Sequence, residues 1–161
     1  MKKSSKGFSL IELLIVVAII LIIAAIAIPN LLRSRIAANQ ASAVGSLRTL
    51  NTSEITYSST FNVGFTSTMT YLGPPASAAT AVNSTAAGLI DSVLASGSKS
   101  GYTFTYSAGN PDSTGRINTY AFIAVPITSS TGTNYYYTDQ SGVIRQNSTT
   151  TAGSTDSPIA G

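Results

Sequence analysis

The sequence contains no cysteine and no histidine, and charged residues make up only 9% of its 161 positions. Without cysteine the chain can form no disulfide, so a small folded region must be held by packing or by assembly with other chains. The cysteine nucleophile and the histidine base of many enzymes are therefore missing, and the six acidic residues form no recognisable catalytic pair or phosphate-binding loop. The sequence predicts a structural protein with no enzymatic activity and no cofactor.

An excess of positive charge is confined to the N-terminus. Lys2, Lys3 and Lys6 are three of the nine basic residues, so the rest of the chain has six basic residues against six acidic ones. A neutral surface reduces repulsion between copies and has no long-range attraction for nucleic acid. We therefore expect self-association and no nucleic-acid partner.

One long apolar segment follows these lysines. Residues 13–28 contain no polar side chain, and with their flanks they extend the apolar region to residues 8–32. A membrane-spanning helix needs about 20 such residues. Because basic residues tend to stay in the cytoplasm, the segment predicts a single span with a cytoplasmic N-terminus and the remaining chain outside.

Glu12 is the exception near the start of this segment. A charged side chain at the centre of a membrane helix costs about 2.5–3.5 kcal/mol, and less near its end. Cleavage between Gly7 and Phe8 would create an amine on Phe8 that could neutralise Glu12, from the same chain or from a neighbouring one. Gly7 has no side chain and would let a protease approach the backbone closely. In the alternative interpretation, Glu12 is solvated among lipid headgroups and has no role.

The stretch Gly7-Phe8-Ser9-Leu10-Ile11-Glu12-Leu13 resembles the class III signal of type IV pilins and of type II secretion pseudopilins. This resemblance implies that a prepilin peptidase/N-methyltransferase cuts after Gly7, a leader of residues 1–7, and methylates Phe8. It also implies that Glu12 meets the Phe8 amine of a neighbouring subunit and sets the register of a homo-oligomeric helical filament.

The same resemblance implies an inner-membrane precursor that dedicated pilus or secretion machinery assembles into an extracellular or periplasmic filament. We expect a type IV pilus subunit for adhesion or motility, with a major-type pseudopilin of type II secretion as the alternative. A more distant alternative is a secreted or membrane-anchored binding domain. Ala25-Ile26-Ala27 fits an ordinary signal-peptidase site, but this interpretation explains neither Glu12 nor Gly7-Phe8.

A long helix is predicted over residues 8–58, with residues 8–32 forming the membrane or filament core. Pro29 removes one backbone hydrogen bond and is expected to kink this helix without ending it. The resemblance implies that this region loses helicity during filament assembly. Beyond Pro29 the apolar residues recur with a helical period, which predicts a stripe that packs on a sheet. The stripe consists of Ile36, Ala43, Leu47, Leu50 and Tyr57.

Residues 59–146 are predicted to form a small globular head. Gly73-Pro74-Pro75 marks a turn in a long connection over residues 58–88, and apolar residues between Leu89 and Leu94 predict a short helix ended by Gly97. Alternating patterns then predict about four antiparallel strands, so the expected fold class is α+β. These patterns cover residues 102–106, 120–125, 134–138 and 143–146.

The last segment, residues 147–161, is rich in Ser, Thr and Gly. It has too little apolar surface to offset its ordering entropy, so a mobile tail is expected.

Two further kinds of site are weighed against simpler explanations. Asp112, Asp139 and Asp156 offer oxygen ligands for calcium, which major pseudopilins bind, but isolated carboxylates in such loops are more simply turn residues, and no metal is predicted. Three Asn-x-Ser/Thr patterns fit N-glycosylation acceptors, although such matches arise readily by chance in this composition. They begin at Asn51, Asn83 and Asn147.

Overall fold

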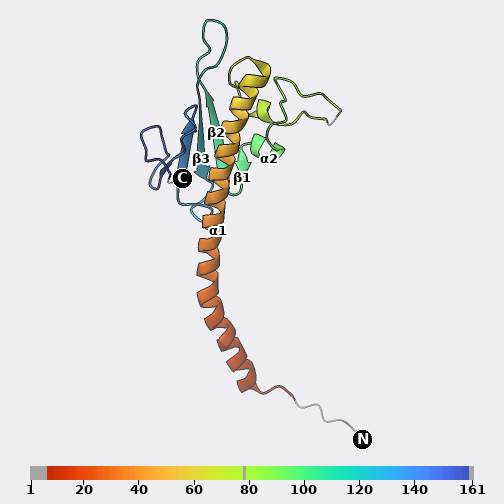
Figure 1. The fold of residues 1–161 in the computed structure, drawn as a ribbon. Coiled ribbons are helices and arrows are strands. Elements are labelled where there is room, and N and C mark those ends of the chain that lie inside the picture. Colours follow the sequence, from red (N-terminus) through yellow and green to blue (C-terminus); the bar gives the residue numbers. More distant parts are fainter. Residues whose placement is uncertain (1–6, 78, 160–161) are drawn as a thin grey trace. The chain divides into compact units, whose positions relative to one another are not determined.

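The computed structural model describes residues 7–77 and 79–159, shown in Figure 1. Its longest element is helix α1, Leu10–Phe61. Two units are distinguished along the chain, one up to Arg35 and one from Ile36 onward, and each is described by itself.

The first unit consists mainly of the N-terminal part of α1. The helix continues through Pro29 without interruption, as the sequence predicts, and it ends at Phe61 instead of residue 58. No residue between 7 and 35 is buried, and the large apolar side chains from Phe8 to Leu32 are all exposed. This unit therefore has no core of its own within a single chain.

The second unit is an α+β head in which α1 packs on a sheet. The sheet has five antiparallel strands in the order β1-β2-β3-β4-β5, so every strand pairs with its neighbour in sequence. The strands are β1 (Ser98–Lys99), β2 (Tyr102–Ala108), β3 (Tyr120–Pro126), β4 (Tyr135–Asp139) and β5 (Arg145–Asn147).

The prediction of about four strands is wrong by one strand. Ser98 and Lys99 form the extra strand β1, which pairs with Thr103 and Tyr102 of β2. Two residues are too few to display an alternating pattern, because the side-chain period of a strand is itself two residues. The remaining four strands lie where the alternating patterns predict them.

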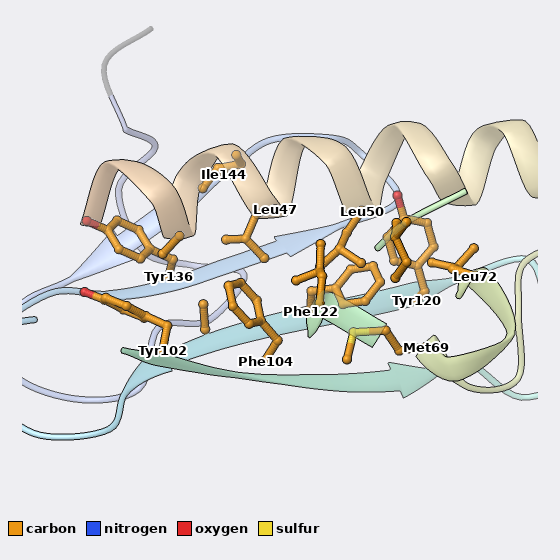
Figure 2. Close-up of a cluster of buried hydrophobic side chains, with 14 of the residues drawn as sticks. Leu47, Leu50, Met69, Leu72, Tyr102, Phe104, Tyr120, Phe122, Tyr136 and Ile144 are labelled. Atoms are coloured by element: carbon orange, nitrogen blue, oxygen red, sulfur yellow. The ribbon is translucent and has the colours of Figure 1, made fainter. Parts of the chain in front are cut away.

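The core lies between α1 and one face of the sheet. Figure 2 shows Leu47 and Leu50 directed from the helix toward aromatic side chains of the strands, including Phe104 and Phe122. Alternate residues of β2, β3 and β4 are buried, as expected when one sheet face is covered. The predicted stripe of α1 is confirmed: Ala43, Leu47, Leu50 and Tyr57 are buried in this core, and Ile36 is half-buried.

Two short helices contribute residues to the head. Helix η1, Met69–Leu72, lies in the expected long connection and places Met69 and Leu72 in the core. Helix α2, Ser92–Ala95, is capped by Asp91, whose Oδ1 accepts a hydrogen bond of 2.9 Å from the Leu94 N–H. Gly97 follows with a φ of +84°, a conformation that favours glycine after a helix.

The C-terminal segment, for which the sequence predicts a mobile tail, forms hydrogen bonds with the residues around β5. Ser157 O accepts a hydrogen bond of 3.0 Å from Gln146 N, and Ile159 N donates one of 2.9 Å to Ile144 O. The Arg145 side chain also donates to Asp156 O at 2.9 Å. These hydrogen bonds hold residues up to 159 against β5. The prediction from composition considered only the small apolar area of the segment and could not include such hydrogen bonds. Residues 160–161 lie outside the described residues.

Candidate functional site

The Gly7–Phe8 peptide lies in an accessible, non-helical stretch just before α1. Phe8 is 78% exposed, and a Cβ built on Gly7 would meet no atom within 4 Å. The fold of this chain therefore does not require glycine at position 7. Lys2, Lys3 and Lys6 lie outside the described residues.

Glu12 contacts the start of its own helix. The backbone N–H of Ser9 donates a hydrogen bond of 2.9 Å to Glu12 Oε2, while Leu13 N donates to Ser9 O at 3.2 Å. This is one half of a capping box, in which a carboxylate three residues into a helix accepts a hydrogen bond from the N-cap N–H. The Ser-x-x-Glu spacing signals this contact in the sequence, but the interpretation of Glu12 given above does not include it.

The apolar part of α1 is a candidate membrane span by length and composition. Its most apolar stretch of 18 residues has a mean hydropathy of 3.3, and no residue of this stretch is buried within the chain. Within residues 7–77 and 79–159, one helix meets this description. So large a contiguous apolar surface needs lipid or other protein chains to cover it.

Comparisons with known proteins match this N-terminal segment. Residues 2–28 fit the family described as the prokaryotic N-terminal methylation motif. Over 37 residues the chain is 65% identical to the type IV wide pilus major component PilA4 of Thermus thermophilus. This N-terminal segment is therefore similar to that of a type IV pilin. The similarity covers 23% of this chain and 28% of that relative, and no solved structure matches the chain.

In the head, the Asn-x-Ser/Thr pattern at Asn51 falls on a buried residue. Asn51 Nδ2 donates a hydrogen bond of 2.8 Å to Thr138 Oγ1, and Asn51 Oδ1 accepts one of 3.1 Å from the Tyr120 hydroxyl. Its amide is thus an internal link between α1 and two strands. Asn83 is exposed and Asn147 is half-buried.

The three candidate calcium ligands each organise a separate turn of the head. Asp112 accepts hydrogen bonds from Thr114 and Asn118 side chains, which hold the pKa of its carboxyl group well below the usual range. Asp139 accepts from Ser141 N, and Asp156 accepts from Gly153 N. These contacts agree with the turn interpretation. Within the described residues, no three acidic, His or Cys side chains gather in a possible metal site.

Glu54, a fully buried acidic residue of the head, is not among the site residues predicted from the sequence. Its two carboxylate oxygens accept hydrogen bonds from Thr66, at 3.0 Å from the backbone N and at 2.5 Å from the hydroxyl. Burial raises the pKa of the Glu54 carboxyl group, and the hydrogen bonds from Thr66 oppose that shift. The sequence does indicate that Glu54 is buried, because Leu50, Glu54 and Tyr57 share the helical spacing of the buried stripe.

Proposed function

We propose that this chain is the structural subunit of a type IV pilus, made as a membrane-anchored precursor and assembled through its N-terminal helix. One observation carries this proposal: the methylation motif over residues 2–28 coincides with a helical surface that the chain leaves wholly exposed. An ordinary secretory signal, which is cut off and discarded, would not explain why Glu12 lies within this apolar surface.

Processing occurs after Gly7 in this proposal. The Gly7–Phe8 peptide is accessible, and Gly7 has no packing role in the fold. This supports recognition of Gly7 by another protein, here a prepilin peptidase that also methylates Phe8. Before assembly the apolar helix lies in the inner membrane, with the leader lysines in the cytoplasm and the head outside.

Assembly transfers the helix from lipid into a bundle with other copies. Once it has left the lipid, apolar burial at roughly 25 cal/mol per Å² stabilises lateral packing. Glu12 sets the register, because a carboxylate in an apolar bundle needs a partner such as the Phe8 amine of a neighbouring subunit. Its hydrogen bond with Ser9 uses one oxygen, and a carboxylate accepts several, so helix capping and subunit pairing are compatible.

A pseudopilin would use the same N-terminal chemistry in a short secretion filament. The pilus is preferred here because the similar relative is named as a wide pilus major component. A secreted binding domain would instead lose residues up to Ala27. Adhesion and motility are the roles that a surface pilus would serve.

The deciding experiment is intact-mass and N-terminal peptide mass spectrometry of the protein from its native cell. A mature chain that starts at methylated Phe8 is expected. A start at Ile28 would mean ordinary secretion and would overturn the proposal. Long surface fibres composed mainly of this chain are then expected by electron microscopy, and their absence beside an active secretion system would favour the pseudopilin.

A further inference from the structure

Glu54 joins α1 to the segment that follows it. Both Glu54 and Thr66 are completely buried, and the carboxyl group holds Thr66 through its backbone N–H and its hydroxyl group. The Tyr106 hydroxyl of β2 completes the arrangement by donating a hydrogen bond of 2.6 Å to Thr66 O. Helix and sheet therefore both bind the connecting segment at Thr66, the helix through the Glu54 carboxyl group and the sheet through Tyr106.

No basic residue accompanies Glu54. The titratable groups that face it are the hydroxyl groups of Tyr57 on α1, Tyr106 on β2 and Tyr120 on β3. Across residues 7–77 and 79–159 no lysine or arginine forms an ion pair with Glu54. An ionised carboxylate buried without a cation is costly, and a group in this situation commonly takes up a proton instead.

The geometry accommodates the neutral acid. If Oε1 carries the proton, it can donate to the Thr66 hydroxyl oxygen, while Oε2 still accepts from the Thr66 N–H. Both contacts with Thr66 are then kept without a buried charge. On ionisation the proton passes to water or to a buffer base, and no covalent bond other than O–H changes.

Residues 62–68 have further attachments to the segment before β3. Phe65 N donates a hydrogen bond of 2.7 Å to Ile117 O, and the Phe65 ring packs edge-on against Tyr120 with centroids 4.7 Å apart. A Cβ on Gly64 would lie 2.5 Å from Ile117 O, so the two backbones are in close contact. If residues 62–68 moved away from the head, these contacts would break. The surface that changes would therefore include the residues around Ile117.

We propose that Glu54 is a proton-controlled latch: its neutral form holds residues 62–68 on the head, and its ionisation releases them while the sheet stays folded. The accessible surface of the head then depends on the pH of the surrounding solution. This inference concerns the head alone and does not depend on the pilus assignment.

The direction follows from the burial of the carboxyl group. Burial raises the pKa of Glu54 in the closed head, whereas an opened segment returns the group to water and to an ordinary pKa. Between these two values the closed form binds one more proton than the open form. The opening equilibrium constant then rises with pH in that interval, by at most tenfold for each pH unit, and is constant outside it. The latch is closed at acidic pH and is weakened as pH rises.

Carboxyl labelling tests the proposal sharply, because Glu12 and Glu54 are the two glutamates of the chain. The full chain in detergent micelles is labelled with 13C at the glutamate carboxyl groups and titrated by NMR, and Glu12→Gln identifies the Glu54 signal. We expect Glu54 to titrate above the usual glutamate range. Titration within or below that range would overturn the latch.

Hydrogen exchange measured by mass spectrometry provides the second readout. After correction for the intrinsic pH dependence of exchange, protection of residues 62–68 should fall as pH rises where Glu54 titrates, by up to tenfold per pH unit. Amides of β3 should keep their protection, and Glu54→Gln should remove the pH dependence in residues 62–68. If Glu54→Gln does not fold, the titration and the hydrogen exchange of the wild-type protein still test the proposal. A Glu54 that titrates while the protection of residues 62–68 stays unchanged would contradict it.

Discussion

The backbone N–H of Ser9 donates a hydrogen bond of 2.9 Å to the carboxylate of Glu12. The charge near the start of the apolar helix thus satisfies a backbone group of the helix that carries it. A negative charge is also favourable at a helix N-terminus, where the backbone N–H groups are unpaired. Glu12 therefore combines an intramolecular role with the proposed pairing between subunits, and substitutions can separate the two.

Glu12→Gln and Glu12→Ala should both prevent filament assembly. Glutamine retains an oxygen that can accept the Ser9 hydrogen bond but has no charge to pair with an amine, whereas alanine loses both functions. Loss of the buried charge pair is expected to cost about 3–5 kcal/mol per subunit. Filaments sheared from cells and quantified by immunoblotting provide the measurement. Normal assembly of Glu12→Gln together with failure of Glu12→Ala would show that helix capping is the important role.

Gly7→Val should leave the head folded but prevent maturation. The substitution adds a branched side chain at the proposed scissile peptide, while a Cβ at Gly7 meets nothing within 4 Å in the chain. Mass spectrometry of membrane fractions should find the leader retained on nearly all molecules. Ser9→Ala is the matched control on the other side of the junction, because the Glu12 hydrogen bond uses the Ser9 backbone N–H. Cleavage of Gly7→Val at the normal rate would contradict the proposed role of Gly7.

Leu47→Ala should destabilise the head by about 2–5 kcal/mol, as expected for truncation of a fully buried leucine. Ile55→Ala on the same helix is the control, because Ile55 is 61% exposed and its truncation should change the free energy of unfolding by less than about 0.5 kcal/mol. Chemical denaturation followed by circular dichroism measures both variants. If both variants lowered the free energy of unfolding equally, the face of α1 that contains Leu47 would not be part of the core.

Asn51→Ala should destabilise the head by about 1–3 kcal/mol, because it leaves Thr138 and Tyr120 without their buried partner. Asn83→Ala changes an exposed asparagine of the same sequence pattern and should have a much smaller effect on the midpoint of denaturation. Glycopeptide mass spectrometry should find Asn51 unmodified in the folded protein. A glycan on Asn51 would be incompatible with the hydrogen bonds described here.

The elements with strong periodicity were predictable from the sequence. The helical stripe from Ala43 to Tyr57 and the alternation in β2 and β3 arise from one requirement, that apolar residues share a buried face. The short strand β1 and the hydrogen bonds of the C-terminal segment were not predictable in this way. Their stability comes from backbone hydrogen bonds to neighbouring strands, and side-chain composition carries little information about such bonds.

By itself, the sequence determined the candidate processing site and the exposed apolar helix, because both depend on local order: a glycine, a carboxylate and a run of apolar residues. Only the tertiary structure decided the surroundings of Glu54 and Asn51. Both residues lie on α1, but their partners Thr66 and Thr138 are brought to them by the fold. A buried polar group acquires its environment from segments distant in sequence, so its pKa and its energetic role are properties of the packed head.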